Sequence, residues 1–441
     1  MQGTEQKNKG TRIIDYLIDT SRPYDIENIP LKLFFFMALL AVILLQQDIL
    51  QSSGIAGAFA VLWGIGFFFF AIGERVKILK AAIGGGLIVA YAGAALMASA
   101  DLVSQDQVAF LQAQIIDNRL MYFILSALVI SSILSVPAKT LRKALISFAP
   151  IILGGLALAA GSGILVGFLI GVPIDQVVTL YFLPIMGGGT GAGAIPMSEI
   201  YAQVTGKSST DYFNFAIGVL TLGNIAAILT ASLLTLAANK FSSLTGNGKL
   251  VRGGEDLDFS NTEQKQPVNT HAAVVFTVCI LVSGVVLAEL VGLIHMFAWV
   301  TLLAISLNFT RLVSAPLQQG MNVLSGWCMK TFIVTLLVAF GLSADLEVIS
   351  SLLSPGNLLL IVAIVVGAAV GAGLVAHFVN CYPFEAALSG GLCMANAGGS
   401  GDLQVLGAAR RLELFPYAQV SSRLGGAFML ILGNYLFEIF Y

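Results

Sequence analysis

The sequence predicts an all-α polytopic membrane protein. Of its 441 residues, 57% are hydrophobic and only 10% are charged, and the mean hydropathy is +0.90. Both fractions lie outside the range of soluble globular chains, so the lipid bilayer is the expected partner of most of the surface. The net charge is −2, and with so few basic residues we expect no nucleic-acid partner.

The apolar runs predict the number of membrane spans. Taking about 18 to 25 apolar residues as one span gives about eleven transmembrane helices. Two more apolar stretches, about 176–206 and 382–412, are interrupted by glycine clusters and are predicted to be re-entrant hairpins. The predicted spans lie near 31–50, 53–72, 81–99, 120–137, 144–170, 211–238, 272–291, 293–309, 325–343, 357–379 and 417–440.

Loop charges predict the orientation of these spans. With the N-terminus in the cytoplasm, most loop Lys and Arg residues fall inside, and only Arg119 and Lys207 fall outside. The count holds only if each glycine-broken stretch enters and leaves at one face. Residues 1–30 are then a cytoplasmic leader, too polar for a signal peptide, and 240–271 form a cytoplasmic linker.

The order of the spans predicts an inverted repeat. Residues 51–239 and 272–441 each hold five spans with a hairpin before the last, and 31–50 is an extra first helix. An odd number of spans turns the second half over relative to the first. The first hairpin should therefore open from outside and the second from the cytoplasm. Broken helices are tolerated at membrane depth only inside protein or beside a watery cavity, which makes them the expected working site.

Each predicted hairpin carries a Gly-Gly-x-Gly motif, at 188–191 and at 398–401. Glycine allows a sharp turn that exposes backbone N–H groups, and a helix beginning there provides an anion site. Thr190 and Ser400 add a hydroxyl at the third position of each motif. A single motif of this kind more often serves close helix packing. Two copies at corresponding places favour a binding site.

Arg423 lies within the last predicted span. An arginine at membrane depth is costly and is by default a functional hypothesis, although it can also snorkel or pair structurally. No acidic residue lies one helical turn away in this span. A substrate carboxylate would fit the guanidinium in a bidentate way.

Cation sites are also expected where the helices break, because backbone carbonyls and side-chain oxygens such as those of Asn396, Ser421 or Ser422 suit sodium. Asp402 could ligate a cation or cap the following helix. No hydrolase-like constellation is present, so the sequence does not predict an enzyme. The histidines and cysteines show no metal-binding spacing: His271, His295, His377, Cys279, Cys328, Cys381 and Cys393.

The paired hairpins, the eleven spans and the segments "MANAGGSGDLQVL" (394–406) and "AQVSSRLGGAFML" (418–430) carry a resemblance. The chain resembles the 2-hydroxycarboxylate transporter family, bacterial secondary carriers of citrate, malate and lactate. The resemblance implies a homodimer in the bacterial inner membrane. Each subunit would have a scaffold domain and a mobile transport domain that holds both hairpins and moves in an elevator-like way.

The resemblance also implies site residues. No covalent cofactor is expected, and Na⁺ or H⁺ would be the coupling ion. The family's substrate contacts fall on Thr190, Gly191, Gly399, Ser400 and Arg423. Its sodium positions, largely backbone carbonyls, fall on Ile185, Gly188, Cys393, Asn396, Gly398, Phe415 and Ser422.

Two departures from the citrate carriers of this family bear on the substrate. Thr190 stands where they have asparagine, and Ala397 stands where they have a second arginine. A tricarboxylate held by one arginine would keep a charge poorly paired at low dielectric. We therefore predict malate, carried by sodium-coupled symport or by malate/lactate exchange. The alternatives are a sodium-citrate symporter and, from another class, an anion channel, which also uses re-entrant loops.

Overall fold

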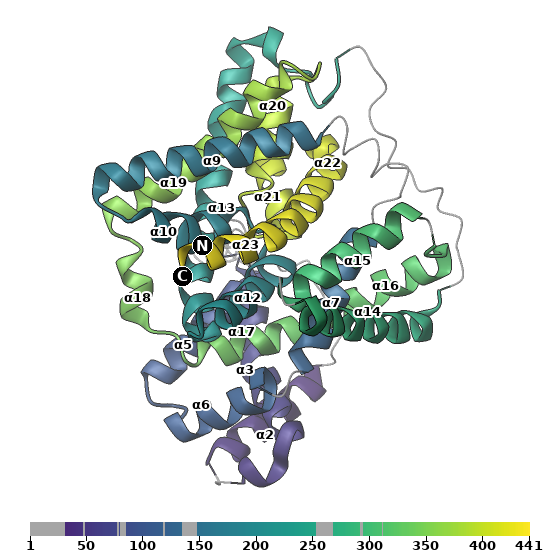
Figure 1. The fold of residues 1–441 in the computed structure, drawn as a ribbon. Helices are drawn as coiled ribbons and strands as arrows, with labels where there is room; N and C mark the ends of the chain where they lie inside the picture. Colours follow the sequence, from purple (N-terminus) through teal and green to yellow (C-terminus); the bar gives the residue numbers. More distant parts are fainter. Residues whose placement is uncertain are drawn as a thin grey trace, which may run out of the picture. The chain divides into compact units, whose positions relative to one another are not determined.

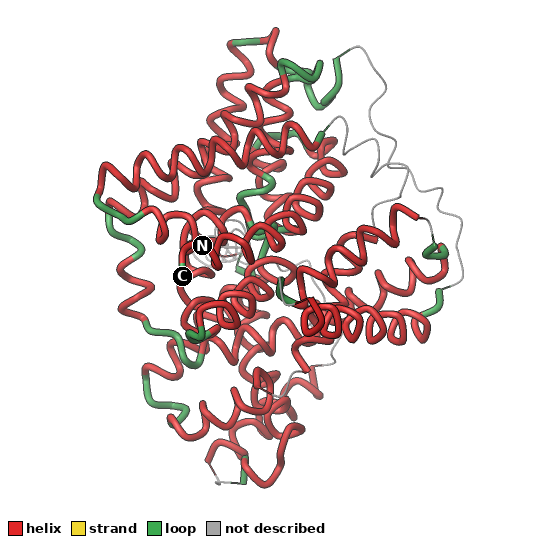
Figure 2. The backbone as a smooth tube through the Cα atoms, in the orientation of Figure 1, coloured by secondary structure: helices red, strands yellow, loops and turns green. Residues whose placement is uncertain are grey.

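The structure, a computed structural model, is helical nearly throughout (Figure 2). The described residues contain no strand beyond one isolated bridge, between Val251 and Cys381. This confirms the all-α prediction. The leader 1–30 and part of the linker, 253–267, lie outside the described residues. These are 31–46, 49–76, 79, 85–117, 120–134, 148–252, 268–291, 294–310 and 312–441.

Seven helices in this part of the chain are long and apolar enough to cross a membrane, or eight if one bent pair counts as a span. The chain is therefore a multi-pass membrane protein, while the total of eleven stays a prediction. Each of the eleven predicted stretches does contain a helix. The long ones include α3 (Gly54–Arg75), α9 (Ala149–Ile170), α13 (Ser209–Lys240), α14 (Thr270–Val291) and α19 (Pro355–Ala376), and the shorter ones are α2 (Leu31–Gln46), α5 (Gly86–Ser99), α7 (Leu120–Leu134) and α15 (Met296–Thr310).

One long helix differs from its predicted bounds. It begins at Ala315 rather than near 325, and α16 (Ala315–Cys328) continues through a π-turn into α17 (Val334–Gly341). The first turns of α16 are amphipathic: Gly320 and Met321 are buried, and Gln318, Gln319 and Asn322 place polar side chains beside them. A search for continuous apolar residues misses such a start, because its polar face lowers the average hydropathy.

The described residues form two compact units. The smaller unit comprises the chain up to Met121 together with Met329–Leu346, and here α3 packs against α2, α5 and α17. The larger unit comprises Tyr122–Cys328 and Glu347–Tyr441. It contains both glycine-broken stretches and the last helix. The division into two inverted repeats stays a prediction.

Within the larger unit, α9 and α19 lie side by side (Figure 1). Glycines allow the close approach: a Cβ on Gly371 would lie 2.1 Å from the carbonyl oxygen of Gly154. Small residues serve the same purpose in many membrane helix pairs. The pair packs against the helical segment that precedes the glycine break in each stretch, residues 174–186 and 383–392. Helix α13 packs against both stretches as well. These three helices therefore support the candidate site.

Candidate functional site

Both glycine-broken stretches have the order helix, break, helix. In the first, helix covers Ile174 to Met186, the chain breaks at 187–189, and helix resumes from Thr190 through α12 (Ile195–Thr205). In the second, helix runs from Pro383 to Leu392, and α21 (Gly399–Ala408) follows the break. We call them the first and second hairpin. The membrane face at which each opens stays a prediction.

The two tips use glycine in the same way. Gly189 has φ 106° and ψ −178°, and Gly398 has φ 77° and ψ −178°. This region of backbone space is essentially restricted to glycine. A Cβ on Gly189 would lie 2.9 Å from the carbonyl oxygen of Ala397 and 2.9 Å from the Cα of Gly398. The tips are therefore in backbone contact, and the motif glycines serve both the turn and the contact.

The contact brings the N-termini of two helices together. Gly189 and Gly398 are the N-caps of the helices that start at Thr190 and Gly399. The first turns of a helix leave N–H groups without intrahelical partners and carry partial positive charge. Thr190 and Gly191 are buried, and Gly399 is exposed. The side chain of Ser400 lies outside the described part of the structure. Four of the five predicted substrate positions thus lie at or next to the tip contact.

The fifth position, Arg423, lies on the helix that supports the first tip. The last helix runs from α22 (Phe415–Val420) through a π-turn, Ser421–Gly425, into α23 (Gly426–Phe440). A Cβ on Gly188 would lie 2.4 Å from the carbonyl oxygen of Ser422, so the tip rests on this π-turn. Arg423 is half-buried there. Residues 174–205 and 383–408 contain no Lys or Arg, so Arg423 supplies the cationic side chain beside the tips.

Asp402 joins the second hairpin to the last helix. It is 0% exposed. Its carboxylate accepts hydrogen bonds from Asn396 Nδ2 at 3.0 Å and from Ser422 Oγ at 3.0 Å, and it interacts electrostatically with Arg423. The N-cap of α21 is Gly398, with no side-chain cap bond. The structure therefore does not show helix capping by Asp402, and cation binding by this carboxylate stays a prediction.

Some of the predicted sodium positions converge on this carboxylate. Ser422 Oγ lies 3.0 Å from the carbonyl oxygen of Cys393 and 3.0 and 3.1 Å from the two Asp402 oxygens. This oxygen-only set with one buried negative charge fits a hard cation such as Na⁺. Among the described residues, no three His, Cys, Asp or Glu side chains cluster, so the structure shows no site of the kind that binds a transition metal through these side chains.

The other predicted sodium positions serve differently. Asn396 Oδ1 accepts from the N–H of Gly398 at 2.7 Å, so this side chain holds the tip. Ile185 lies beside Gly223 of α13, and Phe415 begins α22. The contacts described above do not bring Ile185 or Phe415 into the group formed by Cys393, Asp402 and Ser422.

The sequence analysis missed Asn224 of α13. Asn224 is 1% exposed, its Oδ1 accepts from the N–H of Ala397 at 3.2 Å, and its Nδ2 donates to Gln404 Oε1 at 3.1 Å. It therefore fixes the residue before the second motif. An amide side chain near the middle of an apolar span is a signal that could have identified it, because polar groups at membrane depth are costly unless they have a role.

The sequence model of the 2-hydroxycarboxylate transporter family matches residues 26–435. The citrate/sodium symporter of Salmonella typhimurium is 36% identical over 425 residues, which cover 94% of this chain and 95% of that protein. The citrate/malate-proton symporter of Bacillus subtilis is 31% identical over 429 residues, covering 94% and 92%. The Na(+)-malate symporter of Bacillus subtilis is 28% identical over 430 residues, covering 95% and 93%. All are transporters, which confirms the prediction of a transporter rather than an enzyme.

The tip contact predicts the effect of Gly189→Ala. The change forces a side chain into a glycine-only conformation, at a cost of about 1–3 kcal/mol, and into the backbone of Ala397. We expect a lower unfolding temperature in detergent and loss of substrate uptake in proteoliposomes. Gly206→Ala is the matched control, because Gly206 also has positive φ, 68°, but nothing lies within 4 Å of its Cβ position. Equal effects of the two changes on uptake would contradict a functional tip contact.

Proposed function

Because the chain belongs to the 2-hydroxycarboxylate transporter family, we propose that it is a sodium-coupled secondary transporter of small 2-hydroxycarboxylates, malate foremost. The observation that carries the proposal is that two helix N-termini lie in contact at Gly189 and Gly398, beside the π-turn that contains Arg423. The membrane would be the bacterial inner membrane, with the N-terminus in the cytoplasm.

The site offers malate a partner for each of its polar groups. One carboxylate would bind the Arg423 guanidinium, whose paired N–H groups match a carboxylate in a bidentate way. The other would bind the N–H groups that begin the helices at Thr190 and Gly399, where the helix dipole adds positive potential. The Thr190 hydroxyl is a further polar partner at the same place. These interactions replace the water that a dianion loses on entering the protein.

Ala397 supports malate over citrate. Its N–H is held by Asn224 and its carbonyl meets Gly189, so it belongs to the tip contact itself. Residues 174–205 and 383–408 contain no Lys or Arg, so the further carboxylate of citrate would have no fixed cation of its own at the tips. Citrate is the second candidate, and what favours it is the 36% identity to a citrate/sodium symporter.

Sodium coupling would follow from the group around Ser422. Arg423, the cationic neighbour of the buried Asp402 carboxylate, would be engaged by the substrate, and a cation held by Asp402, Ser422 and the Cys393 carbonyl would then compensate the carboxylate. The carbonyl of the same Ser422 supports Gly188 of the first tip. Bound sodium would therefore order the tips that receive the substrate. By linkage, each ligand would then increase the affinity for the other.

An elevator-type movement is also part of the proposal. Both hairpins, α13 and the last helix belong to the larger unit, which supports their moving as one body. The smaller unit would then contribute to the scaffold. A homodimer is the assembly that the resemblance implies.

Arg423 is the residue whose loss tests the substrate site. With an inward sodium gradient, reconstituted wild-type protein should take up labelled malate, and Arg423→Ala should weaken malate affinity about a hundredfold because two charge-assisted hydrogen bonds are lost. Arg75→Lys, in α3, is the control and should leave uptake unchanged. Wild-type affinity in Arg423→Ala would refute the site. Absence of both malate and citrate uptake by the wild type would refute the function.

Ala397→Arg tests the choice of substrate. A second fixed cation should pair the additional carboxylate of citrate, so the ratio of citrate to malate uptake should rise about tenfold. Ala397→Gln adds a long side chain without charge and should leave the ratio unchanged. Competition between labelled malate and unlabelled citrate measures the effect. An unaltered ratio in Ala397→Arg would count against the pocket argument.

Asp402→Asn tests the coupling ion. Removing the buried negative charge should raise the sodium concentration for half-maximal malate uptake at least about tenfold. Asp106→Asn, at an exposed position in α6 (Gln105–Gln112), is the control. Uptake measured as a function of sodium concentration distinguishes the variants. A half-saturating concentration equal to that of the wild type would exclude Asp402 from the ion site.

A further inference from the structure

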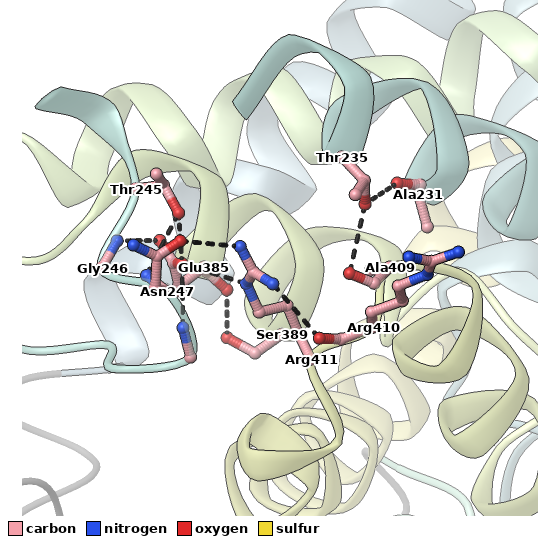
Figure 3. A network of polar contacts seen from close by, with 11 residues as sticks. Ala231, Thr235, Thr245, Gly246, Asn247, Glu385, Ser389, Ala409, Arg410 and Arg411 are labelled. Atoms are coloured by element: carbon pink, nitrogen blue, oxygen red, sulfur yellow. Dashed lines mark hydrogen bonds and ion pairs between the residues drawn. The ribbon is translucent and has the colours of Figure 1, made fainter. Parts of the chain in front are cut away.

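A second buried carboxylate, Glu385, lies at the base of the second hairpin (Figure 3). It stands in the first turn of α20 (Pro383–Ala386) and is 0% exposed. A buried charge is retained only where other groups compensate it. The transport mechanism proposed above gives Glu385 no role, so its partners show what it does.

Three partners of Glu385 come from one turn of the linker between the two halves. Thr245 Oγ1 donates to Glu385 at 2.7 Å, and the N–H groups of Gly246 and Gly248 donate at 2.9 and 3.3 Å. The turn can aim these N–H groups at one point because Asn247 and Gly248 have positive φ, 50° and 97°. Successive N–H groups arranged in this way form an anion cradle, filled here by the protein's own carboxylate.

The fourth partner comes from the other arm of the hairpin. Arg411 follows the end of α21, and its Nε lies 3.7 Å from Glu385 Oε1. Its Nη2 also donates to Asn247 Oδ1 at 3.0 Å. The ion pair and its neighbours are drawn in Figure 3. A single carboxylate therefore joins the first arm, the second arm and the linker.

Residues 245–252 of the linker, which we call the strap, are hydrogen-bonded to the start of the second hairpin's first arm. The N–H of Tyr382 donates to the carbonyl of Leu250 at 2.8 Å, and the N–H of Arg252 donates to the carbonyl of Asn380 at 2.9 Å. Val251 and Cys381 face each other between these two bonds. Opening the strap would break these bonds and leave the buried Glu385 carboxylate with Arg411 as its remaining partner from this group, which is unfavourable.

We propose that the strap is a permanent clasp: it holds the base of the second hairpin closed throughout transport, and Glu385 and Arg411 are positioning residues for the substrate-binding tip. The inference rests on the proposed function. The first arm is helical from Pro383 to Leu392 and ends next to the break at 393–398. A displacement at its base is therefore carried along the helix to the tip.

A disulfide tests whether the clasp stays closed. Val251 and Cys381 form a non-hydrogen-bonded antiparallel pair, the arrangement in which facing side chains are closest, so Val251→Cys should form a disulfide with the native Cys381. Oxidised Val251→Cys should take up malate at the same rate as the reduced protein. Val251→Cys with Cys381→Ser is the control that cannot form this bond. Uptake that falls on oxidation and returns with reductant would overturn the proposal, because the strap would then have to open.

Glu385→Gln tests the positioning role. The neutral amide loses the charge-assisted bonds of the cradle, so the KM for malate should rise about tenfold, and Glu385→Asp should restore part of the affinity. Glu289→Gln, at an exposed position in α14, is the matched control. A role in folding alone would reduce the amount of active carrier and leave KM unchanged, and that result would overturn the proposal.

Cys393 provides a readout that does not depend on the transported molecule. It is 0% exposed and lies where the second hairpin breaks. In a chain with Cys279, Cys328 and Cys381 replaced by serine, Glu385→Gln should make Cys393 react faster with a maleimide. Equal labelling rates with and without Glu385→Gln would overturn the clasp. A clasp confirmed in this way, in protein that takes up neither malate nor citrate, would overturn only the proposed function.

Discussion

The backbone contact between Gly189 and Gly398 is the constraint on which the rest of the site depends. Both residues adopt a conformation that other residues essentially avoid, and each lies where a side chain of the other would stand. This contact places the N-termini of the helices that begin at Thr190 and Gly399 next to each other within an apolar protein. It also sets Gly188 against the π-turn that carries Arg423. The anion site that we propose would thus depend chiefly on backbone geometry, with one arginine added.

Buried charge holds the second hairpin at both ends. Near the tip, Asp402 is bound by Asn396 and by Ser422 of the last helix. At the base, Glu385 is bound by the strap and Arg411. In a low-dielectric interior each carboxylate is tolerated only with these partners, so each also fixes the elements that supply them. The second hairpin is therefore held both at its base and next to its tip.

The sequence predicts much of this arrangement because its signals are local. Runs of apolar residues predict helices, glycine pairs predict where helices break, and an arginine within a span is conspicuous. The clasp could not be predicted, since Glu385 and Thr245 are 140 positions apart and neither residue is unusual in its own segment. Asp402 was left between two roles because its partners on the last helix depend on packing. The polar start at Ala315 was missed because average hydropathy hides an amphipathic turn.

In the proposed mechanism, sodium and the substrate bind to one coupled structure, with Ser422 between the ion group and the first tip. Titration calorimetry of the purified protein in detergent, with malate titrated at low and at high sodium concentration, measures this coupling. Malate should bind more tightly at high sodium concentration and, by reciprocity, sodium should bind more tightly in the presence of malate. Equal malate affinity at both sodium concentrations would contradict coupled binding.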